Sequence, residues 1–87
     1  MAKKAKMALT SQQYMSLCAE AKELHDYWRE WNRSLYNQAA ADGSLYELVS
    51  TKGQRMQDEI DELMQQGMYL YEAREIVWAE IYSSYQP

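Results

Sequence analysis

The sequence predicts an all-α fold, a three-helix antiparallel arrangement whose first helix is long. Three observations lead to this prediction. Apolar residues recur at alternating intervals of three and four over two long stretches, which is the period of one helix face. Gly43 and Gly67 stand between the periodic stretches, and glycine is the residue that most readily ends a helix. Alternation of period two is absent over the same stretches, so we do not expect β-strands.

The first helix is predicted over about residues 11–41. Thr10 is a suitable N-cap, and Gln13 stands three residues later as its capping-box partner. Asp42 and Gly43 end the helix. At 1.5 Å per residue this element would be roughly 46 Å long. Its apolar face consists of Tyr14, Leu17, Ala21, Leu24, Trp28, Trp31 and Leu35.

The second helix is predicted over about residues 45–66. It would begin after Ser44, with Glu47 as the reciprocal partner of a capping box. Gly53 either lets another backbone approach closely or marks a kink, and the sequence leaves both alternatives open. The apolar face of this helix consists of Tyr46, Val49, Gly53, Met56, Ile60 and Leu63.

The third helix is predicted over about residues 69–84, after Gly67. Short turns make neighbouring helices antiparallel, so the result is an α-hairpin with a third helix folding back. Because the first helix is much longer than its partners, part of its apolar face would stay uncovered. We expect a second copy, giving a dimer, or another protein to cover it. The alternative is that Trp28 and Trp31 form the core of the bundle itself.

The chain of 87 residues is long enough for one helical domain, at 10–87, after a flexible basic tail at 1–9. Three of its nine basic residues lie in that tail, whereas all thirteen acidic residues follow it. An acidic body repels phosphates, so we do not expect nucleic-acid binding. The single cysteine, Cys18, fits a cytoplasmic location. No run of eighteen apolar residues predicts a membrane span.

No set of side chains indicates catalysis, so we expect no enzyme, no cofactor and no metal site. His25 is the single histidine, and no carboxylate precedes it by one helical turn. We therefore expect His25 to be a packing or surface residue and not a general base. The sequence holds no Cys/His cluster for zinc and no glycine-rich phosphate loop.

The densest run of charge lies in the second predicted helix, at Asp58, Glu59, Asp61 and Glu62. One interpretation is a solvated helix face. The other is a patch that imitates phosphates. Four carboxylates within five residues span little more than one helical turn. A phosphate-like patch would therefore need further carboxylates alongside, from Glu72, Glu75 and Glu80.

The turn at Gly67 and the third predicted helix resemble a helix-turn-helix in outline. A recognition helix carries basic or amide side chains toward the bases. The third helix offers Arg74 alone, among glutamates. We therefore do not expect the chain to read DNA.

Two segments carry a resemblance to a known family. Residues 28–47 read W-R-E-W-N-R-S-L-Y-N-Q-A-A-A-D-G-S-L-Y-E, and residues 72–82 read E-A-R-E-I-V-W-A-E-I-Y. Together they resemble the transposon-encoded TnpV family of bacterial mobile elements, which similarly shows a basic helix, a glycine turn before Leu-Tyr, and a terminal charged helix. The chain departs from that pattern by being shorter between Leu63 and Glu72. The biochemical role of the family is undefined, so the resemblance implies a mobile-element setting and no mechanism.

We therefore expect a non-enzymatic, cytoplasmic accessory protein of a mobile element or phage that acts by protein–protein contact. Tyr and Trp have apolar bodies and polar tips, which suits interfaces. The alternative is an anti-defence, anti-CRISPR-like inhibitor whose acidic residues at 58–62 occupy the nucleic-acid-binding groove of a host enzyme. The residues predicted as interface anchors are Tyr27, Trp28, Trp31, Tyr36 and Tyr46.

Overall fold

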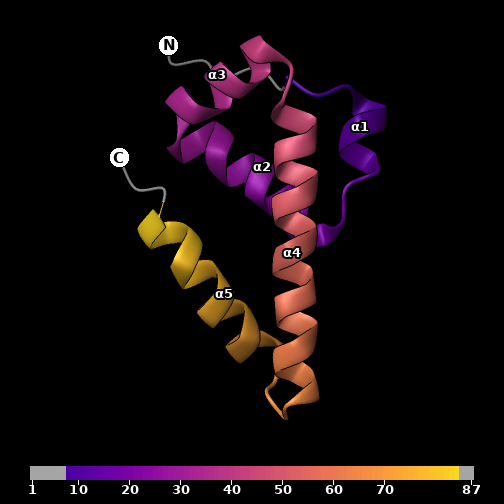
Figure 1. Ribbon diagram of the computed structural model, residues 1–87, viewed down its shortest axis with the longest axis vertical. Coiled ribbons are helices and arrows are strands. Elements are labelled where there is room, and N and C mark those ends of the chain that lie inside the picture. Colours follow the sequence, from indigo (N-terminus) through magenta and orange to yellow (C-terminus); the bar gives the residue numbers. More distant parts are fainter. Residues whose placement is uncertain (1–7, 85–87) are drawn as a thin grey trace.

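The computed structural model describes residues 8–84, and every regular element in that range is an α-helix. The helix at the centre is α4, with α2, α3 and α5 on one side of it and α1 on the other (Figure 1). The prediction of an all-α fold is confirmed. The elements are α1 (Ser11–Met15), α2 (Ala19–Trp31), α3 (Arg33–Asp42), α4 (Leu45–Gln65) and α5 (Leu70–Ser84).

The single helix predicted over about 11–41 is wrong, because the structure divides that range into α1, α2 and α3. Ser16 caps the C-terminus of α1, and its hydroxyl donates to the carbonyl of Gln13 at 2.7 Å. Serine side chains compete for backbone groups in this way and so favour helix ends. Asn32 separates α2 from α3 with φ −140° and ψ 62°, outside the helical region.

The apolar pattern continues through both breaks because α2 and α3 turn their apolar faces to one core. That pattern identified Leu17, Ala21, Leu24 and Trp28 as buried, but it also included the exposed Trp31, and it gave no sign of the breaks. Residues 8–84 therefore form five helices in place of the three that were predicted. The buried core includes Leu17, Ala21, Leu24, Trp28, Tyr36, Val49, Met56, Ile60, Ala73, Val77 and Ile81.

Gly53 lies where α2 crosses α4. The helix α4 runs unbroken through this residue, so it does not kink there. A Cβ atom placed on Gly53 would stand 2.3 Å from the Cα of Ala21. Only glycine allows so close a backbone approach. Of the two alternatives for Gly53, the close approach is confirmed.

The turns on either side of α4 begin at left-handed or near-left-handed glycines, as predicted. Gly43 has φ 80° and Gly67 has φ 104°. The capping box of Ser44 and Glu47 is wrong, because the Ser44 hydroxyl donates to Asp42 Oδ1 at 2.5 Å and makes no bond to α4. Ser44 has φ −96° and ψ −1°, in the helical region, whereas a capping serine takes an extended conformation that brings its oxygen to an N–H of the first turn.

The predicted tail at 1–9 is described only at its last two residues. Leu9 belongs to the buried core, and the backbone N–H of Ala8 donates to the Tyr36 hydroxyl at 2.8 Å. These two residues thus pack against the rest of the protein, and residues 1–7 of the predicted tail lie outside the described range. None of the helices between residues 8 and 84 combines the length and the apolar character that a membrane crossing needs.

Candidate functional site

A polar cluster around the buried Glu20 joins α5 to α2. The indole Nε1–H of Trp78 donates to Glu20 Oε2 at 2.7 Å, and the Nε–H of Arg74 donates to Glu20 Oε1 at 3.0 Å. Arg74 also pairs with Glu23, one turn further along α2. Glu20 is only 5% exposed. Its buried charge is tolerated because strong donors surround it.

The pKa of Arg74 is raised above its ordinary value. Burial opposes the charge, but the hydrogen bond and charge of Glu20, followed by those of Glu23, outweigh the effect of burial. Arg74 therefore stays a guanidinium, with its donors committed to two carboxylates. The basic residue that a DNA-reading third helix would use is thus engaged inside the protein.

A surface depression of about 430 Å³ lies beside this cluster, and we name it the α2–α5 groove. Tyr71 is 66% exposed and Tyr82 is 44% exposed. The Trp78 ring lies 5.8 Å from the Tyr82 ring, centroid to centroid. The groove is lined by Glu23, Tyr71, Arg74, Glu75, Trp78, Ala79 and Tyr82.

Tyr27 supports the groove from α2. Its ring packs edge-on against Trp78, with centroids 6.2 Å apart, and against Tyr82, with centroids 5.1 Å apart. Edge-to-face aromatic pairs of this kind contribute about 1 kcal/mol each beyond the area they bury. We name Tyr71, Trp78 and Tyr82 the aromatic wall of the groove. Tyr27 of α2 packs against two of its rings, those of Trp78 and Tyr82.

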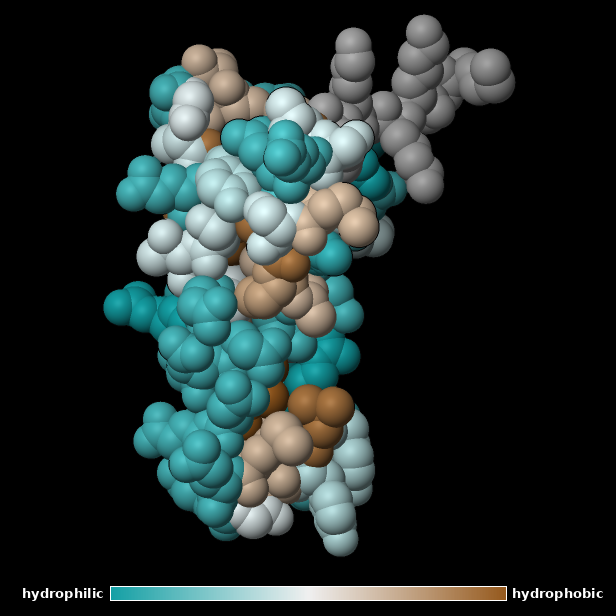
Figure 2. Space-filling view, turned by 90° about the vertical axis from the view of Figure 1, so that its right-hand side faces the viewer, coloured by the Kyte–Doolittle hydropathy of each residue, from teal (hydrophilic) through white to brown (hydrophobic). Residues whose placement is uncertain are grey.

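Further apolar side chains of α5 and the preceding turn reach the surface outside the groove. Tyr69, Leu70 and Ile76 are 69%, 51% and 45% exposed. The ring of Tyr69 stacks on that of Tyr71, with centroids 5.9 Å apart. Figure 2 shows hydrophobic side chains at the surface near the end of the molecule where α4 joins α5. The region around α5 thus has an exposed apolar surface as well as a buried one.

The structure divides the five predicted interface anchors between interior and surface. Trp28 and Tyr36 are 0% and 1% exposed, so they are core residues of this chain and not surface anchors. Trp31 is 66% exposed, at the corner where α2 ends. Tyr27 and Tyr46 are half-buried. Tyr27 contacts two aromatic residues of the α2–α5 groove, Trp78 and Tyr82.

His25 is fully buried, so the expectation of a packing residue is confirmed. A carboxylate nevertheless orients its ring, from the adjacent Asp26. His25 Nδ1 lies 3.0 Å from Asp26 Oδ1, and His25 Nε2 lies 2.9 Å from the Tyr36 hydroxyl. Asp26 was not predicted as a partner, because it is adjacent to His25 and not one helical turn before it. Tyr36 was not predicted either, because the bend at Asn32 is what brings it back against α2.

The hydrogen bonds of His25 extend at both ends. Tyr14 donates its hydroxyl proton to Asp26 Oδ2 at 2.9 Å. With a proton on His25 Nδ1 and with Tyr36 donating to Nε2, each donor of the network meets an acceptor. Both ring nitrogens are engaged and the ring is buried, so neither nitrogen can reach a substrate. The network holds α1, α2 and α3 together.

The four residues of the acidic run lie on α4, and we name them the α4 acidic patch. Asp58, Asp61 and Glu62 are exposed and Glu59 is half-buried. No ion pair found within residues 8–84 includes any of the four. Figure 2 looks onto the side along which α4 runs and shows a broad band of hydrophilic side chains there.

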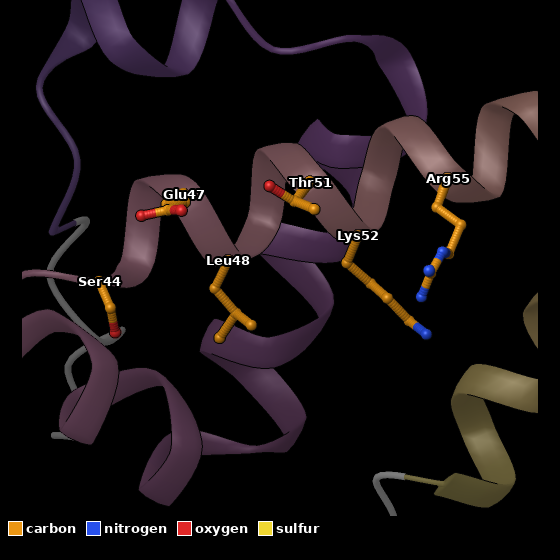
Figure 3. Close-up of a pocket in the computed structure, with 6 residues that line it drawn as sticks. All are labelled: Ser44, Glu47, Leu48, Thr51, Lys52 and Arg55. Carbon is orange, nitrogen blue, oxygen red and sulfur yellow. The ribbon is translucent and has the colours of Figure 1, made fainter.

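A second depression, of about 460 Å³, lies along the first half of α4. Lys52 and Arg55 point to the same side of the helix in Figure 3. The residues that line this depression come from α4 and from Ser44 just before it, and none of them is aromatic, in contrast to the α2–α5 groove. They are Ser44, Glu47, Leu48, Thr51, Lys52 and Arg55.

Within residues 8–84 no three His, Cys, Asp or Glu side chains are arranged to hold a metal ion. Comparison with protein-family models, with curated proteins and with solved structures finds no match to this chain. The resemblance to the TnpV family stays a prediction. The α2–α5 groove, with its exposed aromatic side chains beside a depression, is the strongest candidate site.

Proposed function

We propose that this chain is a non-enzymatic accessory protein of a mobile element or phage that acts by binding another protein through the α2–α5 groove. The observation that carries the proposal is the exposure of Tyr71 and Tyr82 around a defined depression. Exposed aromatic residues beside a hollow are typical of protein-binding sites. The mobile-element setting rests on the resemblance to the TnpV family.

Side chains of the groove are held in place by contacts within the chain before any partner binds. Trp78 and Arg74 are tied to Glu20, and Tyr27 packs against the aromatic wall. A surface that is already ordered loses less conformational entropy when a partner binds. This arrangement supports a binding role for the groove.

The partner is either another protein or a second copy of the chain. Light scattering of the purified protein over a range of concentrations separates the two cases. A constant mass of 10.3 kDa excludes self-association. A mass that doubles with concentration supports the homodimer.

The binding proposal is tested with the double variant Tyr71→Ser/Tyr82→Ser. The immobilised wild-type chain is expected to retain a protein from a bacterial lysate, and the purified pair is then measured by calorimetry. We expect the double variant to bind that partner at least about tenfold more weakly. Because Tyr82 also packs against Tyr27 and Trp78, the double variant should unfold at a lower temperature than the wild type, and its binding is measured well below that transition, where circular dichroism shows it folded.

Met15→Ser is the matched control. Met15 is 69% exposed and lies on α1, which Figure 1 places on the other side of α4. We expect this variant to bind as the wild type does. Equal affinity of the double variant and the wild type would contradict the proposed role of the groove.

A second candidate function is the anti-defence inhibitor whose carboxylates occupy the nucleic-acid-binding groove of a host enzyme. The observation that favours it is the α4 acidic patch, whose carboxylates form no ion pair within residues 8–84. Binding should then weaken with salt and be abolished in Asp58→Lys/Glu62→Lys. Binding that is insensitive to salt and to this charge reversal would count against it.

A further inference from the structure

The α2–α5 groove carries an excess of negative charge. Glu20, Glu23 and Glu75 lie in or beside it, and Arg74 is the single basic residue among its lining residues. Arg74 pairs with Glu20 and Glu23. Glu75 is exposed, and no ion pair found between residues 8 and 84 includes it. A cation entering the groove would therefore be attracted, and an anion repelled.

The same groove is walled by aromatic rings. Tyr71, Trp78 and Tyr82 line it, and the planes of Trp78 and Tyr82 are tilted by 36°. Aromatic faces attract cations. Tyr71 and Tyr82 are the exposed rings of the groove, whereas Trp78 is 6% exposed and packs against Tyr82. Guanidinium groups also stack on such rings. Exposed aromatic rings beside the unpaired carboxylate of Glu75 favour a ligand that is cationic at its tip and apolar along its stem.

We propose that the α2–α5 groove receives a basic side chain, arginine above all, from the partner protein. This inference rests on the proposed function and specifies the chemistry of the partner. The guanidinium would lie against the aromatic wall near Glu75, and its methylene stem would cover the exposed ring edges. Arginine fits better than lysine because its flat, weakly hydrated cation loses less on leaving water.

The test uses small probes that isolate the side chain. N-acetyl-arginine amide and its neutral isostere, N-acetyl-citrulline amide, are titrated into the full chain while the indole N–H signals are followed by NMR. Trp78 lines the groove, whereas Trp28 is buried and Trp31 lies outside the lining. We expect the arginine probe to shift the Trp78 signal saturably and to leave the other two unchanged.

The citrulline probe should bind at least about tenfold more weakly, because it has the same shape without the charge. Equal shifts from the two probes would overturn the inference. It would also fail if N-acetyl-norleucine amide bound as well as the arginine probe, which would make the groove a plain apolar site. A Trp78 signal that moves with protein concentration alone would identify a second copy as the occupant and overturn it too.

A pair of variants checks the role of the carboxylate. Glu75→Gln is expected to weaken binding of the arginine probe about threefold to tenfold. Glu80→Gln is the control, since Glu80 is exposed on the same helix but does not line the groove. The inference is contradicted if Glu75→Gln binds the arginine probe as tightly as Glu80→Gln does.

Failure of this inference is distinguishable from failure of the proposed function. If Tyr71→Ser/Tyr82→Ser abolishes binding of the partner, but the wild type binds the arginine and citrulline probes equally well, the proposed function stands and the inference fails. If the partner binds the double variant as tightly as it binds the wild type, the proposed role of the groove is contradicted. In that case the inference falls with it, whatever the probes show.

Discussion

Burial separates residues that look alike in the sequence. Trp28 and Trp31 stand three positions apart on the same periodic face, yet one is 0% exposed and the other 66%. Asn32 ends α2 directly after Trp31. The chain turns there, so Trp28 faces α4 and Trp31 is left at the corner. Two tryptophans with one sequence pattern therefore have different roles.

Replacing these two tryptophans by alanine should have unequal effects. Trp28→Ala is expected to lower the free energy of unfolding by about 4 kcal/mol, because it leaves a large cavity in the core. Trp31→Ala should change it by less than about 0.5 kcal/mol, because the ring is exposed. Urea denaturation of both variants measures the difference, and equal losses would contradict the assignment of core and surface.

Tyr14 links the buried polar network to pH. Burial raises the pKa of Tyr14 above the ordinary value of 10.0 for tyrosine, and the hydrogen bond and charge of Asp26 raise it further, while the charge of Arg29 lowers it. The folded state thus favours the neutral phenol. The stability from Tyr14 is complete below the unfolded pKa and is lost as the pH rises through the folded value.

Tyr14→Phe tests this dependence. At about pH 7 the variant should be about 1 kcal/mol less stable than the wild type, and the difference should shrink by about pH 10.5. Urea denaturation at the two pH values gives both differences. A difference that stays constant would show that the Tyr14 phenol does not titrate differently in the folded and unfolded chains.

At the scale of elements, two features decide how the helices sit. The crossing of α2 and α4 depends on Gly53 against Ala21, and the docking of α5 on α2 depends on Glu20. The first is a contact between backbones and the second is a buried charge with its donors. Each can be tested by one substitution with a control close by.

Gly53→Ala should destabilise the protein although alanine is the better helix former. The added Cβ would meet the Ala21 backbone at 2.3 Å, so α2 and α4 would have to separate. We expect a loss of about 3 kcal/mol, greater than the gain of about 1 kcal/mol in helix propensity. Gln54→Ala, at the next and exposed position of α4, should be nearly neutral in the same denaturation experiment. A stabilised Gly53→Ala would disprove the close crossing.

Glu20→Gln should loosen α5. The substitution removes the charge that Arg74 pairs with inside the protein, and we expect a loss of about 2 kcal/mol. Glu23→Gln is the control, because the Glu23 side chain is 54% exposed and surface pairs contribute less than about 1 kcal/mol. Hydrogen exchange of the α5 amides measures the effect locally. Equal exchange in the two variants would contradict the central role of Glu20.

At the scale of the whole molecule, one core connects all the helices. The described chain measures 44 × 27 × 22 Å, and its core includes residues from α2, α3, α4 and α5. The polar network adds α1 through Tyr14. With contacts shared so widely, no helix has a core of its own.

Unfolding should therefore be a single cooperative transition. Circular dichroism reports all the helices, whereas tryptophan fluorescence reports the surroundings of Trp28 and Trp78. We expect the two signals to give the same midpoint in urea. An earlier transition in one of them would show that α5 unfolds separately, against the single domain predicted at 10–87.

The site was only partly predictable. Tyr27 was identified as an interface residue from its type, and it does support the α2–α5 groove. Tyr71, Trp78 and Tyr82 were not identified, although their spacing places them along one side of a helix, and that spacing is the signal that would have found them. The pairing of Glu20 with Arg74 spans 54 positions and leaves no local pattern.

The sequence by itself determined the helical class, the ends of α4 and most of the buried positions, because period, glycines and apolar spacing are local properties of the chain. Only the tertiary structure decided that residues 11–41 form three helices, that Trp31 lies outside while Trp28 lies inside, and that side chains of α5 line a groove together with Glu23 of α2. A periodic pattern records which side chains face the core. It does not record where the chain bends to bring them there, because the bends are stabilised by contacts between residues distant in sequence.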